Sequence, residues 1–255
     1  MAAGLLLDCR PVGRVGKHYG GQLGTKYFAW QGQGGELSAQ IERTKFERWT
    51  SSDTAVVDFG CGAGHLLELL PARRRLGVEP NESARLVAQE RGLNVVASTS
   101  EVPERFADVV ISNHALEHTL APWDELCGLR RVLKPNGRLV MWLPLDDWRT
   151  QRHPLEDDNH HLYAWTPLLL RNLLDEAGFE VELVRVVTHA WPQFHEQLFR
   201  ALPRRAFDAL ATAWAFTTRH RQLMAVASCP LATDDSARGQ PVLVQREGLL
   251  GDPAP

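Results

Sequence analysis

The sequence contains little cysteine, and its four cysteines lie far apart. Cys9, Cys61, Cys127 and Cys229 form no C-x-x-C pair, so neither a disulfide framework nor a zinc knuckle built from paired cysteines is indicated. We expect all of these thiols to be reduced.

An excess of charge of one sign and long apolar runs are also missing. The formal net charge is −3, which leaves no basic surface of the kind that binds nucleic acid or an anionic membrane. The N-terminal segment MAAGLLLDCR has a short apolar run without a preceding positive charge, and no later run is long enough to span a bilayer. We therefore predict a cytoplasmic protein with no nucleic-acid partner and no membrane insertion.

The chain does contain a regular alternation of β-branched runs and helical segments. One helical segment, NESARLVAQERG, has Asn81 as its expected N-cap and Gly92 just past its end. Such alternation is typical of a doubly wound sheet. We predict an α/β fold with a Rossmann-like, mostly parallel, seven-stranded sheet and helices on both faces. The expected strands are residues 55–59, 75–80, 94–98, 108–113, 137–145, 180–191 and 222–228.

Three segments surround or interrupt this pattern. Residues 1–35 form a cap segment with many aromatic residues, and it is too rich in glycine for a regular core element. The main domain covers residues 36–230, beginning with a helix from about Ser38 through Trp49, and has a helical insertion at about 193–221 that breaks near Pro203. Residues 231–255 have the composition of a disordered tail.

The strongest chemical signal is the segment VVDFGCGAG at residues 56–64. Gly60, Gly62 and Gly64 allow the backbone after Asp58 to pass close to a ligand at a helix N-terminus. Glycine-rich turns of this kind occur in several nucleotide-binding folds and also as purely structural turns. Glu79 ends the next strand about twenty residues later, where a carboxylate can accept hydrogen bonds from both ribose hydroxyls of an adenosine. Together the two signals predict an adenosine-containing ligand.

Four segments between residues 53 and 145 carry a family resemblance. VVDFGCGAG, the acidic end of GVEP, DVVISNHALEH and LRRVLKPNGRLVMWLP together resemble the class I S-adenosylmethionine-dependent methyltransferases. A Rossmann dehydrogenase would usually show G-x-G-x-x-G, whereas here His65 follows Gly64, which disfavours an NAD-dependent oxidoreductase. The resemblance implies S-adenosyl-L-methionine as the cofactor.

The resemblance also implies how the cofactor is bound. Asp58 and the backbone of Gly60 and Gly62 would hold its methionine part, and Glu79 would hold its ribose. The turn at Ser98 and Thr99 would lie near the adenine, although the acidic residue common in the family is absent there. Aromatic residues of the cap segment are candidates for a lid that excludes water and attracts the sulfonium. The predicted cofactor-binding residues are Tyr19, Tyr27, Gln31, Asp58, Gly60, Cys61, Gly62, Gly64, Glu79, Pro80, Ser98, Thr99, Asn113 and His114.

Two segments outside the core resemble a bacterial methyltransferase subgroup that often accompanies genes for sugar-containing products. They are HYGGQLGTKYFAWQGQGGE and NHHLYAWTPLLLRNLLDEAGF. This resemblance implies O-methylation of a small acceptor, a sugar or another natural product, by a monomer or homodimer. A carbon or nitrogen methyltransferase of secondary metabolism and a non-catalytic S-adenosylmethionine-binding subunit are the alternatives. Aromatic candidates for an acceptor pocket are Trp165, Trp191, Phe194 and Trp214, although Trp214, on a helix, is more typical of a core residue.

The segment HALEH at residues 114–118 matches the H-x-x-E-H signature of the inverted zinc peptidases. That interpretation requires a long helix and a third, distant ligand, whereas Pro122 follows shortly after and a strand lies directly before. Coenzyme Q-type O-methyltransferases carry E-x-x-E-H at this place for a divalent metal, and here His114 replaces the first glutamate. A structural interpretation has Leu116 packed and His118 bound to a backbone carbonyl. We predict no bound metal.

Methyl transfer to a hydroxyl requires alignment of the acceptor and removal of a proton near the sulfonium. His118 and Glu117 are candidate catalytic residues, and so are His160 and His161 just after the fifth strand, because histidine titrates near neutrality. We favour His160 or His161 over His118. The alternative is that the segment EDDNHH is a solvated acidic loop.

Overall fold

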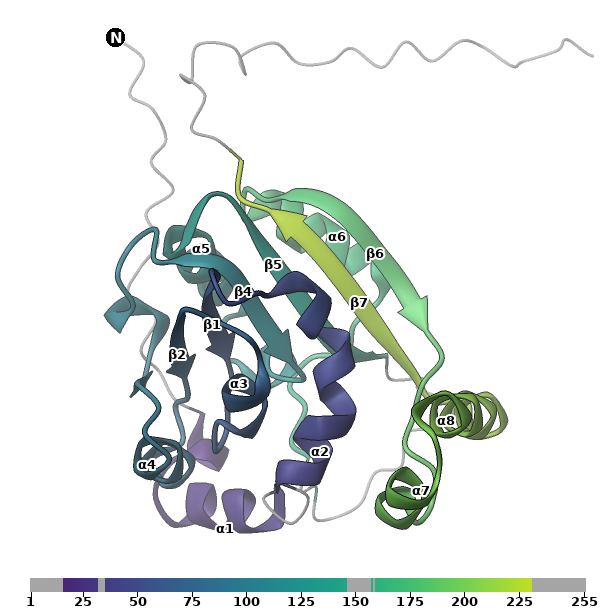
Figure 1. Ribbon diagram of the computed structural model, residues 1–255. Coiled ribbons are helices and arrows are strands. Elements are labelled where there is room, and N and C mark those ends of the chain that lie inside the picture. The colour runs from purple at the N-terminus through teal and green to yellow at the C-terminus, as the bar shows by residue number, and fades with distance from the viewer. Residues whose placement is uncertain (1–15, 32–34, 146–156, 158, 231–255) are drawn as a thin grey trace, which may run out of the picture.

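One sheet forms the centre of the protein. The computed structural model describes residues 16–31, 35–145, 157 and 159–230, and in this part seven strands are ordered β3-β2-β1-β4-β5-β7-β6 (Figure 1). Strands β1 to β5 run parallel, and β7 runs antiparallel to β5 and β6. This confirms the predicted mostly parallel, Rossmann-like sheet. The strands are β1 (Ala55–Phe59), β2 (Arg74–Val78), β3 (Val95–Val96), β4 (Ala107–Asn113), β5 (Leu133–Leu145), β6 (Glu180–Val187) and β7 (Arg221–Ser228).

Helices cover both faces of the sheet, with α2 and α3 on one side and α5 and α6 on the other (Figure 1). Every residue of β1 is buried, as in a strand covered on both faces. Val57 belongs to a core cluster with Leu126 and Leu170, while Val56 belongs to the opposite cluster with Leu67. The helices are α1 (Gly21–Gln31), α2 (Gly35–Glu42), α3 (His65–Leu69), α4 (Glu82–Glu90), α5 (Pro122–Val132), α6 (Pro167–Glu176), α7 (His195–Ala201) and α8 (Arg204–Thr218).

The strand order reverses next to β1. The chain adds β2 and β3 on one side of β1 and then places β4 and β5 on its other side. The loops that follow β1 and β4 therefore diverge and leave a crevice at the carboxyl ends of the strands, where open α/β sheets bind their ligands. This position brings the glycine loop at residues 60–64 next to the segment at residues 114–118.

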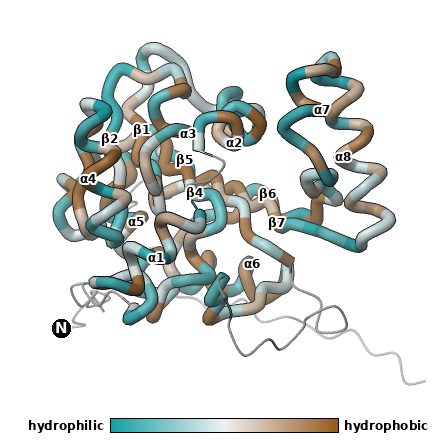
Figure 2. The backbone as a smooth tube through the Cα atoms, turned by 90° about the horizontal axis from the view of Figure 1, so that it is seen from below, coloured by the Kyte–Doolittle hydropathy of each residue, from teal (hydrophilic) through white to brown (hydrophobic). Residues whose placement is uncertain are grey.

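The pair α7 and α8 stands beside the β6 and β7 end of the sheet (Figures 1 and 2). Pro203 separates the two helices and is the N-cap of α8. Phe207 and Ala211 of α8 are fully buried and pack on Ile41 of α2. The insertion is therefore attached to the segment that precedes the sheet in sequence.

The cap segment is more regular than its composition predicts. Gly21–Gln31 forms α1, after a 3-10 turn at Lys17–Tyr19, although Gly24 is the one buried residue of this helix, which is therefore not a core element. Contacts with distant residues explain the difference. Nδ2 of Asn81 donates a hydrogen bond of 2.8 Å to the carbonyl of Gly24, which ties α1 to the beginning of α4.

The predicted helix from Ser38 through Trp49 is wrong in its extent. Helix α2 ends at Glu42 and is followed by two 3-10 turns, Arg43–Lys45 and Glu47–Trp49. The turns allow Phe46 to become completely buried against the sheet. Tertiary packing therefore overrides the local helical pattern.

Further expectations concern the two terminal segments, membrane insertion and the cysteines. The predicted disordered tail at 231–255 and the first fifteen residues of the cap segment lie outside the described residues. Within the described ranges, no helix has the length and apolar character needed to cross a membrane. Cys61, Cys127 and Cys229 are buried, and within the described residues they form no disulfide.

Candidate functional site

The loop between β1 and α3 has a backbone conformation that glycine adopts easily. Gly60, Gly62 and Gly64 have φ angles of 78°, 54° and 79°, in the left-handed region. A Cβ on Gly60 would lie 2.4 Å from Cβ of Ala115, and one on Gly64 would lie 2.2 Å from Cδ1 of Leu93. A Cβ on Gly62 would meet no atom within 4 Å. Packing therefore requires glycine at the outer two positions, while Gly62 borders open space.

The carboxylate of Glu79, at the end of β2, is held by the same loop. Its Oε2 accepts a hydrogen bond from the backbone N–H of Gly62 at 2.9 Å, and its Oε1 accepts one from Asn81 at 2.8 Å. Burial raises the pKa of Glu79, and the two backbone donors oppose that shift. The carboxylate is thus fixed at the wall of a cavity, with lone pairs left to accept hydrogen bonds from ligand hydroxyls.

A first cavity of about 360 Å³ lies between this loop, the end of β2, the turn after β3 and the cap segment. Most of the predicted cofactor-binding residues line it. These are Tyr19, Tyr27, Gln31, Gly60, Gly62, Glu79, Pro80, Ser98, Thr99 and His114. Of the other predicted cofactor-binding residues, Asp58, Cys61 and Asn113 line a second cavity described below, and Gly64 lies in the turn beneath.

The turn after β3 forms one end of the first cavity. Thr99 is buried, and its hydroxyl donates a hydrogen bond of 3.5 Å to Oε2 of Glu125. Burial raises the pKa of Glu125 to about 7. Glu101, the last residue of the 3-10 turn Thr99–Glu101, also lines this end. Two carboxyl groups are therefore present here, although the acidic residue expected from the resemblance is absent at Ser98 and Thr99. The sequence analysis missed Glu125, because it lies on α5 and belongs to no local motif.

Aromatic side chains of the cap segment form another wall of the first cavity. The rings of Tyr19 and Tyr27 meet edge to face, with 4.9 Å between centroids, and Oη of Tyr19 lies 2.5 Å from Nδ1 of His118. Burial raises the pKa of Tyr27 to about 12 and that of Tyr19 even further. Both phenols therefore stay neutral at physiological pH and present an uncharged wall.

A second cavity of about 810 Å³ lies on the other side of the glycine loop. The buried ammonium of Lys45 is paired with Glu42 and donates hydrogen bonds to Oδ1 of Asn113 at 3.2 Å and Oε1 of Gln222 at 2.9 Å. Trp191 donates its indole N–H to Oε1 of Glu42 at 3.1 Å. Burial acts to raise the pKa of Glu42, but the ammonium of Lys45 outweighs it and lowers that pKa. The wall is therefore a fixed polar network beside an indole ring.

Only part of this second cavity is predictable from the sequence. Trp191, a predicted acceptor-pocket residue, does line the cavity. Lys45 and Gln222 are 177 positions apart in the chain, and no local pattern marks either of them. The other aromatic candidates lie elsewhere. Trp165 is buried in the core, Phe194 is 70% exposed, and Trp214 is partly exposed on α8.

Asp58 borders the second cavity at the end of β1. Its side chain is almost completely buried. Burial, and then the charge of Glu79, raise the pKa of Asp58 to about 7. A ligand with an ammonium group would favour the ionised carboxylate here.

The two cavities meet at four shared lining residues, Gln31, Gly60, Gly62 and His114. Among these four, His114 is the titratable one. It has a φ of 53°, which is uncommon for a residue with a side chain. Its Nε2 lies 3.3 Å from Oε1 of Gln222, and its Nδ1 lies 3.5 Å from Oε1 of Glu117. The imidazole is therefore placed at the junction between two oxygen acceptors.

The segment HALEH does not form the helix of a zinc peptidase. Strand β4 ends at Asn113, and only Leu116–His118 forms a 3-10 turn. The ring of His114 lies against Gln222, whereas His118 lies against Tyr19. The two histidines therefore do not share one helical face, and the H-x-x-E-H motif is not formed as a zinc-peptidase ligand set.

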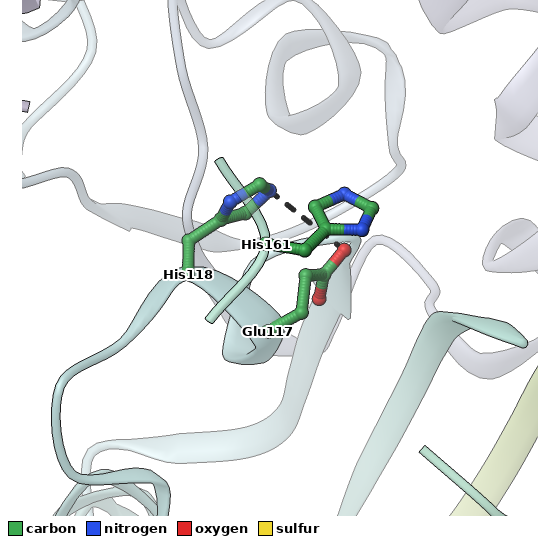
Figure 3. Close-up of side chains that lie close together, drawn as sticks. All are labelled: Glu117, His118 and His161. Carbon is green, nitrogen blue, oxygen red and sulfur yellow. Dashed lines mark ion pairs between the residues drawn. The ribbon is translucent and has the colours of Figure 1, made fainter. Parts of the chain in front are cut away.

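Parts of the structural interpretation do hold for this segment. Leu116 is fully buried, and Nδ1 of His118 lies 3.5 Å from the carbonyl oxygen of His160. Burial lowers the pKa of His118, so its imidazole is neutral at physiological pH. Glu117 lies fully buried between the histidines, and His161 approaches from the loop that follows β5 (Figure 3).

The four predicted catalytic residues are brought together beside the first cavity. His118 is the one among them that lines it. His160 has a φ of 50° and stacks on His18 with 4.4 Å between ring centroids. The rings of His161 and His118 meet with 4.9 Å between centroids. The structure thus gathers four residues into one cluster: Glu117, His118, His160 and His161. His114 lies next to this cluster, with its Nδ1 3.5 Å from Oε1 of Glu117.

Comparisons with known proteins agree with this architecture. Residues 30–184 match the family model described as a methyltransferase domain. Ubiquinone biosynthesis O-methyltransferase of Pseudomonas fluorescens strain Pf0-1 is 34% identical over 106 residues, which cover 36% of this chain and 45% of that protein. The chain spans less than half the length of the first curated relatives that it matches.

Solved structures share the fold at low sequence identity. The putative methyltransferase in a complex with the Haloferax volcanii Trm112 activator superimposes with a TM-score of 0.57 at 16% identity, covering 81% of this chain and 98% of that chain. Phosphoethanolamine N-methyltransferase 2 of Haemonchus contortus, in complex with S-adenosyl-L-methionine, gives a TM-score of 0.55 at 16% identity, covering 84% of this chain and 58% of that one.

Proposed function

The chain belongs to the methyltransferase-domain family, and from this premise we propose that it transfers the methyl group of S-adenosylmethionine to an oxygen atom of a small acceptor. The observation that carries the proposal is the junction of the two cavities at Gln31, Gly60, Gly62 and His114. A donor whose adenosine part lies in the first cavity and an acceptor in the second would meet there. In-line attack on the sulfonium methyl requires this kind of arrangement, with donor and acceptor on opposite sides of the transferred group.

The first cavity suits the adenosine part of the donor. Glu79 presents a fixed carboxylate to ribose hydroxyls, and the tyrosines of the cap segment offer uncharged faces near a sulfonium. Asp58, beyond the glycine loop, is placed to receive the ammonium of the methionine part. A donor in this orientation would direct its methyl group toward the junction.

The second cavity suits a hydroxyl-bearing acceptor such as a sugar. Its wall offers the indole of Trp191 and hydrogen-bonding atoms of Asn113 and Gln222, and sugar rings combine stacking on aromatic faces with hydrogen bonds to such groups. The pairing of Lys45 with Glu42 neutralises both charges. These features favour a neutral polar acceptor over a strongly charged one.

We assign the removal of the acceptor proton to His114. Nδ1–H can point toward Glu117, which leaves the lone pair of Nε2 for the acceptor hydroxyl. After proton transfer, Nε2–H can donate to Oε1 of Gln222, 3.3 Å away. The oxygen of Gln222 is fixed in this orientation because Lys45 donates to it. His118, His160 and His161 are the competing bases, and they lie on the side of the first cavity.

Calorimetric titration with S-adenosylhomocysteine, in parallel with NAD, tests the donor. We expect micromolar binding of the former and none of the latter. Screening for release of S-adenosylhomocysteine with sugar nucleotides, glycosides and phenols then tests the acceptor. A folded protein that binds NAD instead would overturn the proposal, and transfer to a nitrogen or carbon nucleophile alone would overturn the assignment of oxygen.

With an acceptor in hand, His114→Asn tests the base, because asparagine tolerates the positive φ at this position. We expect kcat to fall by about 100-fold or more, with loss of the acidic limb of the pH–rate profile. If His118→Asn or His161→Asn abolishes that limb instead, the base lies in the other cluster.

A further inference from the structure

Two buried glutamates near the first cavity have opposite surroundings. Both carboxylate oxygens of Glu79 receive backbone hydrogen bonds, whereas neither oxygen of Glu117 has a hydrogen-bond partner although its side chain is completely buried. A buried carboxylate without hydrogen bonds or a counter-charge is strongly disfavoured. The nearest nitrogens, Nδ1 of His114 and Nε2 of His118, lie 3.5 and 3.8 Å from Oε1 of Glu117, beyond a good hydrogen bond, so a bound cation would complete its surroundings.

Two imidazole rings converge on this carboxylate. One ligand atom from each of Glu117, His118 and His161 can be chosen such that all three atoms lie within 4.8 Å of one another (Figure 3). Glu117 and His118 belong to the 3-10 turn after β4, and His161 belongs to the loop after β5. That loop is held close by hydrogen bonds from the backbone N–H groups of Leu162 and Tyr163 to the carbonyl of Glu117, at 2.9 and 3.3 Å.

The hydrogen bonds of His118 indicate which ring nitrogen is free. Nδ1 of His118 lies 3.5 Å from the carbonyl oxygen of His160 and 2.5 Å from the hydroxyl of Tyr19. The carbonyl oxygen can only accept a hydrogen bond, whereas the hydroxyl can donate or accept one. A proton on Nδ1 suits both contacts, and the lone pair of Nε2 then faces Oε1 of Glu117 at 3.8 Å. In this tautomer the two electron-rich atoms are placed to share one cation. A metal-bound histidine commonly donates its other N–H to an oxygen in this manner.

We propose that Glu117, His118 and His161 bind one divalent transition-metal ion, with Zn²⁺ as the best-fitting species. Two imidazoles and one carboxylate form a ligand set that zinc accepts, whereas Mg²⁺ and Ca²⁺ prefer oxygen ligands alone. Ligand atoms around zinc lie about 3.4 Å apart when each is about 2.1 Å from the metal. Rotations of the side chains that bring atoms now up to 4.8 Å apart closer by about 1.4 Å are therefore enough to close the site.

This ligand set differs from the one that the sequence motif suggests. In H-x-x-E-H the partner of His118 would be His114, but His114 lies against Gln222 at the junction. The third ligand comes instead from His161, 43 positions further along the chain than His118. The proposed site departs from the expectation of no bound metal and would join two loops. Through the contact of His118 with Tyr19 the metal would also hold the cap segment.

Zinc binding by the tag-free protein tests the site without any knowledge of the acceptor. After removal of metals with a chelator, calorimetric titration with Zn²⁺ should show one equivalent bound with micromolar or tighter affinity. Glu117→Gln and His161→Ala should each weaken this binding by about tenfold or more, because each removes one ligand. His220→Ala removes an exposed histidine outside the cluster and should leave the affinity unchanged.

Absorption of bound Co²⁺ in the visible range provides a second readout. The spectrum should show a low-symmetry site with nitrogen ligands, and it should change in His161→Ala but not in His220→Ala. Circular dichroism of each variant establishes that it is folded. The proposal is overturned if Zn²⁺ does not bind the folded protein, or if Glu117→Gln binds it as the unaltered protein does. Titration with S-adenosylhomocysteine is a separate measurement, so a failure here is distinguishable from a failure of the proposed function.

Discussion

At the scale of single residues, buried carboxylates determine most of the chemistry of the site. Glu79 is held by two backbone donors, Glu117 by none, and Asp58 lies next to Glu79 with a pKa raised to about 7. Each of these groups costs stability in the free protein and becomes useful when a ligand supplies the missing partner. Substitutions at these positions should therefore have different effects on the stability of the ligand-free protein and on ligand binding.

Glu79→Gln should impair donor binding severely. The amide group can accept only through one oxygen, so its NH₂ would face the backbone N–H of either Gly62 or Asn81, and the ribose would lose an anionic acceptor. We expect the affinity for S-adenosylhomocysteine to fall by about 2–3 kcal/mol, measured by calorimetry. Glu90→Gln, at an exposed position on α4, is the matched control and should bind normally. Unchanged binding by Glu79→Gln would remove Glu79 from the donor site.

Asp58 should make the stability of the ligand-free protein dependent on pH. Its pKa rises from 3.8 to about 7 on folding, so between these values the folded state binds more protons than the unfolded state, and stability must fall as pH rises. Asp58→Asn cannot ionise and should lose this dependence. We expect the variant to gain about 2–4 kcal/mol relative to the unaltered protein between about pH 5 and about pH 8. The free energy of unfolding of both proteins can be measured with denaturant at several pH values. If it changes with pH in the same way in Asp58→Asn and in the unaltered protein, the prediction is wrong.

At the scale of helices and strands, α1 is the element that most depends on its tertiary surroundings. A Cβ on Gly24 would lie 2.4 Å from the carbonyl oxygen of Tyr19, so Gly24→Ala must displace α1 or the turn before it. Because Tyr19, Tyr27 and Gln31 line the first cavity, we expect the affinity for S-adenosylhomocysteine to fall about tenfold.

Gly20→Ala is the matched control for this substitution. A Cβ at Gly20 meets no atom within 4 Å, and its φ of −108° suits any residue. Calorimetry should give an affinity within about twofold of the unaltered protein. If both variants bind alike, the position of α1 does not matter for the donor.

The contrast between α1 and α4 explains what the sequence alone could predict. Helix α4 begins where predicted because its N-cap is local: Oδ1 of Asn81 accepts hydrogen bonds from Ser83 and Ala84. The glycine loop could also be predicted, because its residues are contiguous in the sequence. Helix α1 was missed because a contact from Asn81 to Gly24, 57 positions apart, stabilises it. The second cavity was missed for the same reason, as its walls come from α2, β4 and β7.

At the scale of the whole molecule, Lys45 connects three parts of the chain. Its ammonium pairs with Glu42 at the end of α2 and donates hydrogen bonds to Asn113 at the end of β4 and Gln222 in β7. The side chains of both members of the ion pair are less than one-tenth exposed. The end of α2 and the strands β4 and β7 are thus joined at one buried charge.

Lys45→Met should therefore destabilise the protein far more than a surface substitution does. It leaves Glu42 buried without its counter-charge, for which we expect a loss of about 3–5 kcal/mol in the free energy of unfolding. Because Lys45 lowers the pKa of Glu42, the contribution of the pair is present above the usual pKa of a glutamate and disappears as the pH falls through the lowered value. The loss in the free energy of unfolding caused by Lys45→Met should accordingly be smaller at acidic pH.

The double variant Glu42→Gln, Lys45→Met separates the pair from its surroundings. Removing both charges avoids the unpaired carboxylate, so denaturant unfolding should show the double variant recovering at least about 1–2 kcal/mol relative to Lys45→Met. Arg43→Met, which breaks an exposed pair with Glu47, should cost less than about 1 kcal/mol. If the double variant is no more stable than Lys45→Met, the hydrogen bonds to Asn113 and Gln222, rather than the charge of Glu42, make Lys45 necessary. The connection between α2 and the sheet would then depend on the geometry of these amides.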